Sequence, residues 1–292
     1  GSFLIGAGFS VLEATLSAVL ADEFPNESVR HLNFSQVAFS FGALLSPALA
    51  AGMIRKNVYF QNIYFIAAGF FAVLGGICYL SYRRTTTIAN NTDRITEQFS
   101  GFFHNRGLLL LAIAVCIYVG VENTTANFTE VYFHSKLDLA AYSAIALSIY
   151  WGAMIPSRYL AGTLKLNIKT MLIVSCSITF LGLIAAMLLT NPIAKLAMVA
   201  LCGFGCGPIW PLLMNQASKE NQGSSGLIMN VMFSFCAMGG VLLPILAGFV
   251  SDVGDVGFVY YLCAGAIVAV LLISSIAERR KARLALERAT GA

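Results

Sequence analysis

The chain has 292 residues, of which 58% are hydrophobic and 11% are charged, and its formal net charge is +4. A soluble domain normally carries roughly 25% charged residues, so this composition excludes an ordinary water-soluble fold. The small positive charge is attributed to Lys and Arg in the loops on one side of a membrane, and it does not indicate a nucleic-acid-binding protein.

Long apolar runs account for the missing charge. Nine of them approach the roughly 20 residues that a helix needs to cross a bilayer. They lie at residues 1–21, 37–54, 64–82, 108–128, 142–164, 171–189, 197–213, 227–250 and 258–276. Because a spanning helix satisfies its own backbone hydrogen bonds, the runs predict an all-α membrane protein. The first run is not a signal peptide, since no basic segment precedes it and Glu13 lies in its middle.

The distribution of Lys and Arg predicts the orientation. If the chain starts outside and crosses nine times, 14 of its 18 basic residues fall on the inner side. Basic residues are enriched in cytoplasmic loops, so the C-terminus is expected in the cytoplasm. The protein itself is expected in the cell (inner) membrane. The longest polar stretch, residues 83–105, is then an inner loop. The segment 279–292 is a basic cytoplasmic tail, and the run 278–288 is expected to form a basic helix at the inner surface.

An internal echo suggests two related halves. The tripeptide Phe-Ser-Phe occurs at residues 39–41 and, 194 positions later, at 233–235; each copy is followed by Pro-x-Leu-Ala, at 47–50 and 244–247. A spaced glycine pair opens the span before each copy: Gly6 and Gly8, then Gly203 and Gly205. Spans 1 and 2 therefore correspond to spans 7 and 8. Spans 4 to 6 lack partners, which would occupy about 90 residues before residue 1 and complete twelve spans in two sets of six.

This arrangement resembles the major facilitator superfamily, and local motifs resemble its fucose permease-like branch. Residues 8–14, 30–36, 118–122 and 150–154 look like motifs of that branch's fourth, fifth, seventh and eighth spans. Two positions depart from the family: Ser157 replaces the usual Gly before Arg158, and Leu16-Ser17 stand where Asn-Pro often follows the buried Glu. The resemblance implies a major facilitator fold that lacks its first three spans here. Its expected parts are residues 1–82 (rest of the N-terminal bundle), 83–105 (central loop), 106–278 (C-terminal bundle) and 279–292 (tail).

Two acidic residues, Glu13 and Glu122, fall near the middle of spans, whereas no Lys or Arg does. A carboxylate without a cationic partner is costly there, so each is expected to be protonated when sealed from water and ionised when a cavity opens. That behaviour suits proton coupling. Two alternatives stay open: a protonated Glu bonded to a neighbouring helix for structure alone, or a Glu paired with an Arg on a preceding span.

Polar and aromatic residues suggest a binding site. Residues 122–130 carry seven polar side chains in nine, and Asn123 and Asn127 lie on one helix face, as in a discontinuous helix that lines a water-filled cavity. The alternative is a helix end that emerges into water. Gln36 matches a position that contacts sugar in the resembled family, and its amide can both donate and accept. Its alternative is a solvent contact at a helix end.

Three further residues are weaker candidates for binding. Tyr150 and Trp151 offer flat faces to a sugar ring, although aromatic residues in membrane helices more often pack. Asn230 is the lone amide in the body of the eighth span. Arg158, at an inner span end, is expected to act as a gating or anchoring charge. Pro208, Pro211 and Pro244 are expected to mark kinks in the seventh and eighth spans, where helices bend during alternating access, so Pro208 and Pro211 are further gating candidates.

Together these features predict a secondary transporter, not an enzyme, that works by alternating access coupled to protons. Since no cation lies at depth, a neutral sugar or a cationic solute is favoured over an anion. The alternative is a proton-coupled exporter of drugs or metabolites with the same fold. The expected partners are a small-molecule substrate, protons and the lipid bilayer; neither a metal nor a cofactor is expected, and the protein is expected to be a monomer.

Overall fold

The regular elements of the described residues are helices. The computed structural model describes residues 2–82, 99–136, 140–220 and 225–290. The helices are α1 (Ser2–Glu23), α2 (Ser28–Arg55), α3 (Phe60–Tyr82), α5 (Arg106–Val131), η1 (Tyr132–Lys136), α6 (Ala140–Thr163), α7 (Ile168–Leu188), α8 (Pro192–Cys206), α9 (Ile209–Ser218), α10 (Ser225–Val253) and α11 (Phe258–Thr290). They cover each of the nine predicted spans, with α8 and α9 sharing the seventh.

Seven stretches of the described helices are long and apolar enough to cross a membrane. They fall on α1, α3, α5, α7, α10, α11 and the α8–α9 pair. The other two predicted spans correspond to α2 and α6, in which several side chains lie outside the described part. The all-α membrane prediction is therefore confirmed.

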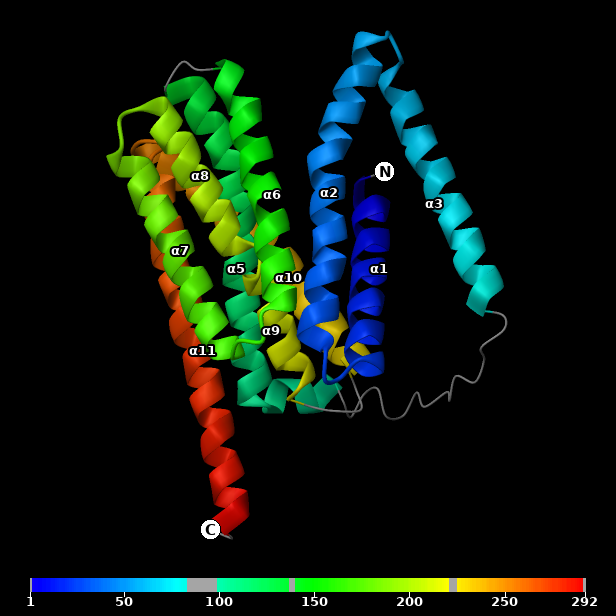
Figure 1. Ribbon diagram of the computed structural model, residues 1–292, viewed down its shortest axis with the longest axis vertical. Helices are drawn as coiled ribbons and strands as arrows, with labels where there is room; N and C mark the ends of the chain where they lie inside the picture. The colour runs from blue at the N-terminus through cyan, green and yellow to red at the C-terminus, as the bar shows by residue number, and fades with distance from the viewer. Residues whose placement is uncertain (1, 83–98, 137–139, 221–224, 291–292) are drawn as a thin grey trace.

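The helices form two groups (Figure 1). Helices α5 to α11 pack into one bundle, and α1 and α2 lie beside it. Helix α3 stands apart, and its main contact is with α2. We call the end with the α1–α2 turn and the C-terminus the lower end, and the end with the α2–α3 turn the upper end. Successive spans alternate in direction, as the nine-span topology requires, and α8 and α9 run the same way within one span.

Asparagine caps begin three helices of the bundle. The side-chain oxygens of Asn105, Asn167 and Asn191 accept hydrogen bonds from backbone N–H groups in the first turns of α5, α7 and α8. Such caps satisfy donors that have no partner within the helix. They fix where the chain turns back into the bundle.

Glycines bring the bundle helices into close contact. A Cβ at Gly239 of α10 would overlap the backbone carbonyl of Cys116 in α5, and a Cβ at Gly203 of α8 would overlap that of Tyr150 in α6. The backbones touch at these points because no side chain intervenes. The bundle therefore behaves as one packed block.

The discontinuous helix lies elsewhere than predicted. Residues 122–130 belong to the unbroken α5, which continues into the π-helical turn η1, so a break in this stretch was wrongly predicted. The break falls instead between α8 and α9, at Gly207 and Pro208. Pro208 has no N–H to donate to the preceding turn, so the helix cannot continue regularly through it.

The other proline positions do not interrupt helices. Pro211 lies in the first turn of α9, where a missing N–H is tolerated, and Pro244 lies inside the continuous α10. At the lower end, α11 runs without a break to Thr290 (Figure 1). The basic segment expected as a helix on the inner surface is thus the extension of a span.

Candidate functional site

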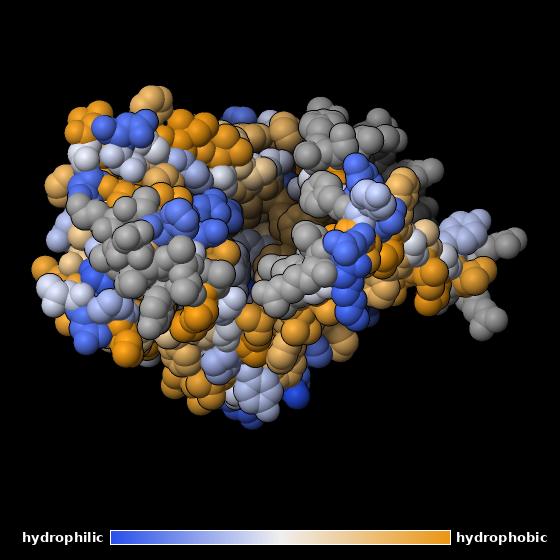
Figure 2. All heavy atoms as spheres, turned by 90° about the horizontal axis from the view of Figure 1, so that it is seen from above, coloured by the Kyte–Doolittle hydropathy of each residue, from blue (hydrophilic) through white to orange (hydrophobic). Residues whose placement is uncertain are grey.

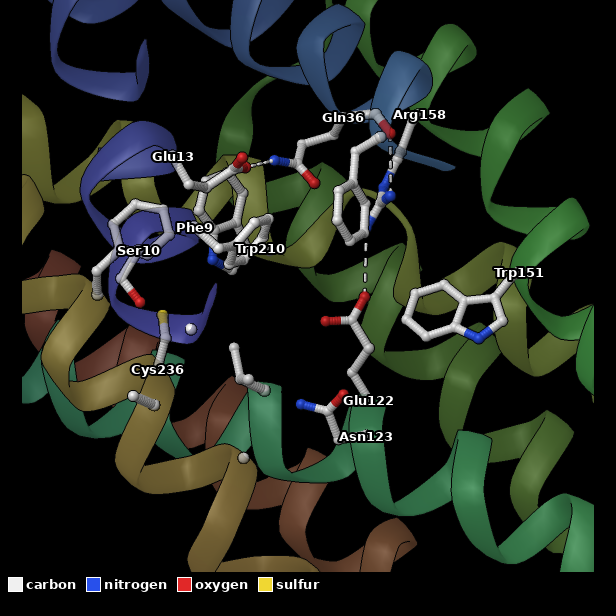
Figure 3. A pocket seen from close by; sticks show the side chains of 16 residues that line it. Phe9, Ser10, Glu13, Gln36, Glu122, Asn123, Trp151, Arg158, Trp210 and Cys236 are labelled. Carbon is white, nitrogen blue, oxygen red and sulfur yellow. Dashed lines mark hydrogen bonds and ion pairs between the residues drawn. The ribbon is translucent and has the colours of Figure 1, made fainter. Parts of the chain in front are cut away.

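A cavity of about 290 Å³ lies where the two groups of helices meet. Helices α1, α2, α5, α6, α9 and α10 all contribute to its wall (Figure 3). The residues that line it are Gly6, Phe9, Ser10, Glu13, Gln36, Phe39, Val119, Glu122, Asn123, Trp151, Arg158, Trp210, Phe233, Cys236, Ala237 and Gly240. Seen from the upper end, the surface is hollowed between the groups, with hydrophobic residues at the bottom (Figure 2).

Glu13 and Gln36 form the polar pair on the α1–α2 side. The Gln36 Nε2 donates to Glu13 Oε1 over 2.5 Å, and both side chains face the cavity (Figure 3). The two residues lie 23 positions apart on neighbouring helices that run in opposite directions. No ion pair to Glu13 occurs among the described residues.

Glu122 and Arg158 form a second pair on the opposite wall. Arg158 Nη2 lies 3.3 Å from Glu122 Oε1, and the two side chains are 1% and 11% exposed. The sequence indicated no cation at this depth, and that prediction was wrong. Arg158 lies near the lower end of its span, but the cavity extends down to it, so its guanidinium neutralises Glu122.

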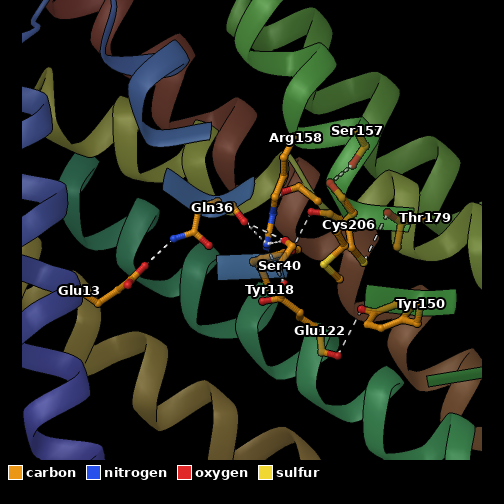
Figure 4. A network of polar contacts seen from close by, with 12 residues as sticks. Glu13, Gln36, Ser40, Tyr118, Glu122, Tyr150, Ser157, Arg158, Thr179 and Cys206 are labelled. Atoms are coloured by element: carbon orange, nitrogen blue, oxygen red, sulfur yellow. Dashed lines mark hydrogen bonds and ion pairs between the residues drawn. The ribbon is translucent and has the colours of Figure 1, made fainter. Parts of the chain in front are cut away.

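Arg158 also joins the two groups of helices (Figure 4). Its Nη1 donates to the Gln36 backbone carbonyl at 3.1 Å and to Ser40 Oγ, both on α2, while its Nε donates to the Gly207 carbonyl at 3.0 Å. One side chain thus connects α6 to α2, α5 and the α8–α9 junction. This position is compatible with the gating or anchoring role predicted for Arg158, which remains a prediction.

The carbonyls at the α8–α9 break find donors within the bundle. Tyr118 Oη donates to the Cys206 carbonyl at 2.7 Å, and Arg158 Nε donates to that of Gly207. The last carbonyls of a helix have no partner within it, so external donors stabilise the interruption. The break is therefore tied to the same polar network as Glu122.

Five aromatic rings line the apolar part of the wall. Phe9 lies 6.1 Å from Phe39, Phe39 lies 6.4 Å from Trp151, and Trp210 lies 5.5 Å from Phe233, all between ring centroids. The rings come from five helices and surround the two polar pairs. Such a cavity offers flat apolar faces together with a few oriented donors and acceptors, which is the usual composition of a small-molecule site.

Comparison with known proteins identifies the family. The sequence matches the Major Facilitator Superfamily over residues 1–238. The chain belongs to this superfamily. With its apolar helices, it is a multi-pass membrane protein, and the fold resemblance inferred from sequence motifs is confirmed.

Individual relatives refine the comparison. The chain is 26% identical over 258 residues to the "Glucose/mannose transporter GlcP" of Bacillus subtilis (strain 168). The aligned residues cover 85% of this chain and 64% of that relative. The chain thus spans less than two thirds of that relative's length.

Two solved structures share the fold. A major facilitator transporter, FucP, in an outward conformation gives a TM-score of 0.72 at 14% identity, covering 91% of this chain and 72% of that chain. A substituted form of the E. coli fucose:proton symporter FucP gives 0.68 at 13% identity, covering 94% and 83%.

Six of the predicted site residues meet in the cavity of this major facilitator protein. They are Glu13, Gln36, Glu122, Asn123, Trp151 and Arg158. Their roles in coupling and binding stay predictions, but the structure places them within one small volume.

The other predicted site residues lie outside the described lining. Tyr150 is buried behind the wall, where its hydroxyl donates to the Glu122 backbone carbonyl at 3.3 Å. Asn127 is exposed one turn above Asn123 on α5, and Asn230 is exposed on α10. Pro208 and Pro211 belong to the α8–α9 break and to α9 rather than to the wall.

Some lining residues were missed by sequence reasoning although the echo contained a signal for them. Phe39 and Phe233 begin the two copies of Phe-Ser-Phe, and both line the cavity. Glu13 and Trp210 occupy equivalent places after their glycine pairs, seven residues beyond Gly6 and Gly203, and both also line it. The repeat thus marks cavity-facing positions in both halves.

Contacts between α2 and the bundle close the lower end beneath the cavity. The Phe34 ring stacks on Tyr159 at 5.7 Å, and Asn215 Nδ2 donates to Ser28 Oγ. Gly162 lies against Phe34, which a Cβ at that position would meet at 2.9 Å. The cavity is therefore closed below, while the molecule is hollowed above.

Proposed function

We propose that the protein is a secondary active transporter that moves a small neutral sugar across the membrane by alternating access coupled to protons. The observation that carries the proposal is the shared cavity, in which Glu13, an acid that forms no ion pair among the described residues, faces a wall of aromatic rings and amides. Its volume of about 290 Å³ is just below the roughly 300–1,000 Å³ typical of ligand pockets, which suits a small ligand.

Glu13 is the proposed coupling residue. Arg158 already balances Glu122, so the charge of the cavity changes when Glu13 gains or loses a proton. The Gln36 amide donor stabilises the ionised form, whereas burial favours the neutral one. Because these two effects oppose each other, the Glu13 carboxyl group can take up a proton from one side of the membrane and release it to the other.

Amides and rings are the proposed sugar contacts. Asn123 and Gln36 can donate and accept hydrogen bonds with hydroxyl groups, and Trp151 and Trp210 can cover the apolar face of a pyranose ring. Arg158 uses its Nε and both Nη groups on protein acceptors, so it is poorly placed to hold an anionic substrate. The match to a glucose/mannose transporter supports the same substrate class.

The proposed orientation places the lower end in the cytoplasm. Basic residues gather there, including the C-terminal extension of α11, in agreement with the positive-inside rule. The described conformation is then open outward and closed inward. Transport requires the α2 contacts with α6 and α9 to separate.

Uptake by the complete transporter in vesicles with an imposed pH gradient tests the proposal. The Glu13→Gln variant keeps a hydrogen-bonding side chain but cannot change its charge. We expect it to lose gradient-driven accumulation of glucose or mannose by more than tenfold, while exchange of labelled for unlabelled sugar across the membrane continues. The matched control is Glu23→Gln, which changes an exposed acid at the lower end of the same helix.

Unchanged accumulation by Glu13→Gln would exclude Glu13 as the coupling group. Sugar uptake by the unaltered transporter that is independent of the pH gradient would exclude proton coupling itself.

A proton-coupled exporter of drugs or metabolites is the second candidate. The five aromatic side chains of the lining attract flat cations through their ring faces as well as stacking on sugars. An ionised Glu13 would add a negative charge that attracts the same cations. A strain lacking the transporter separates the two functions: greater sensitivity to cationic dyes with normal sugar uptake favours the exporter.

A further inference from the structure

Helices α7 and α11 lie on the side of the bundle away from α1–α3 (Figure 1). An apolar groove runs between them. Its volume is about 370 Å³, and its lining consists of Cys176, Ser177, Phe180, Leu181, Ile267, Val268 and Leu271. Cys176 and Ile267 are buried at its floor, whereas Leu181 and Val268 are 59% and 41% exposed at its rims. In a membrane protein this groove, which we call the α7–α11 groove, faces lipid.

Two basic side chains lie in line with the groove at the lower end. On α7, Lys169, Cys176 and Phe180 follow the spacing i, i+7, i+11; on α11, Val268, Ser275 and Arg279 follow the same spacing. Residues with this spacing share one helix face. Lys169 and Arg279 are both exposed and therefore stand at the lower mouth of the groove.

The spacing along the helices matches one leaflet of a bilayer. Lys169 precedes Cys176, the first lining residue of α7, by seven residues, and Arg279 follows Leu271, the last lining residue of α11, by eight. The groove therefore begins about 10–12 Å above the two charges at a rise of 1.5 Å per residue. Half of a hydrocarbon core is about 15 Å. A phosphate held by the two cations would place an acyl chain of the same lipid along the groove.

One acidic residue lies near the mouth of the groove. Glu278 follows Ile267 of the groove floor by eleven residues, so it shares that face of α11. It also lines a small cavity with Lys219, Glu220 and Lys281, in which Lys281 pairs with Glu220 at 3.0 Å. Lys169 and Arg279 outnumber this one acid, so the mouth stays positive overall.

We propose that the α7–α11 groove binds one anionic phospholipid of the cytoplasmic leaflet, with its phosphate on Lys169 and Arg279 and one acyl chain against Cys176 and Ile267. A zwitterionic phospholipid fills the groove equally well but gains less from the two cations. The site is separate from the transport cavity, so it rests on the proposed orientation alone and not on the proposed substrate or coupling.

Native mass spectrometry of the purified full-length transporter with phosphatidylglycerol and phosphatidylcholine of identical chains tests the site. We expect preferential retention of one phosphatidylglycerol by the unaltered protein. Each surface cation contributes about fivefold to the affinity for anionic lipid, so Lys169→Ala with Arg279→Ala should weaken phosphatidylglycerol binding about 25-fold.

A charge-matched control removes two cations from the same end but outside the groove. Arg30→Ala with Arg280→Ala should retain phosphatidylglycerol at the unaltered level. Equal loss in this control would overturn the proposal, because it would show diffuse attraction to the basic end.

A third variant tests the groove without changing charge. Leu181→Trp fills its rim, and we expect it to release the lipid as the cation variant does. Retention by Leu181→Trp, or displacement of the lipid by soluble glycerol phosphate, would overturn the acyl-chain contact. An unchanged thermal unfolding midpoint verifies that each variant is folded.

Discussion

At the residue scale, Arg158 is the side chain on which most of the polar network depends. It is 1% exposed, and its donors reach α2, α5 and the α8–α9 junction (Figure 4). A buried charge is tolerated when it is paired and its donors are satisfied, and it is costly when either condition fails. Glu122 and Arg158 should therefore act as one unit.

A double-mutant cycle measures this dependence. We expect Glu122→Leu and Arg158→Met to cost about 3–5 kcal/mol each, because each leaves the other charge or its backbone partners buried and unpaired. The double variant should cost less than the sum of the two, with a coupling of up to about 3 kcal/mol. Denaturant unfolding in detergent micelles gives the free energies.

The control is the pair Arg30 and Glu27, at 3.1 Å with side chains 55% and 58% exposed. Exposed pairs contribute roughly 0–1 kcal/mol, so its coupling should be small. Strict additivity for Glu122 and Arg158 would show that the buried pair does not act as a unit.

At the element scale, close backbone contact between α5 and α10 holds one wall of the cavity. A Cβ at Gly239 would overlap the Cys116 carbonyl, and a Cβ at Gly120 would meet Leu243 at 2.6 Å. Backbone atoms cannot move aside as side chains do. We expect Gly239→Ala to push the helices apart and to cost about 1–3 kcal/mol of stability.

Gly248→Ala on the same helix is the matched control. A Cβ there has nothing within 4 Å, so helix propensity alone should stabilise the variant by up to about 1 kcal/mol. Thermal unfolding of both variants should therefore shift in opposite directions. A stable Gly239→Ala protein would show that α5 and α10 are not in backbone contact.

Helix positions could be predicted from the sequence better than helix continuity. Nine apolar runs indicated the spans because hydropathy reports burial in lipid directly. The polar stretch after Glu122 wrongly predicted a break, since its side chains are accommodated around a regular α5. The actual break at Pro208 was expected only as a kink, because its cause includes donors from Tyr118 and Arg158 on other helices.

At the scale of the whole molecule, the site depends on how the two groups of helices meet. The sequence singled out Glu13, Gln36, Glu122 and Asn123 by their polarity in apolar runs, and these residues converge in the cavity. It could not show that Arg158 reaches Glu122, because that contact depends on how α5 and α6 pack in the bundle. The contacts of α2 with α6 and α9 form the closure that separates the cavity from the lower end.

Alternating access predicts that the closure must open during each cycle. Ser28 and Asn215 are bonded across it, one on α2 and the other on α9. Ser28→Cys with Asn215→Cys should form a disulfide under mild oxidation, lock the lower end and reduce uptake by more than tenfold, with recovery after reduction. Each single variant, treated identically, is the control for oxidation of the seven native cysteines. Normal uptake through a fully cross-linked protein would mean that the substrate passes without separation of α2 from α9, and it would exclude alternating access at this closure.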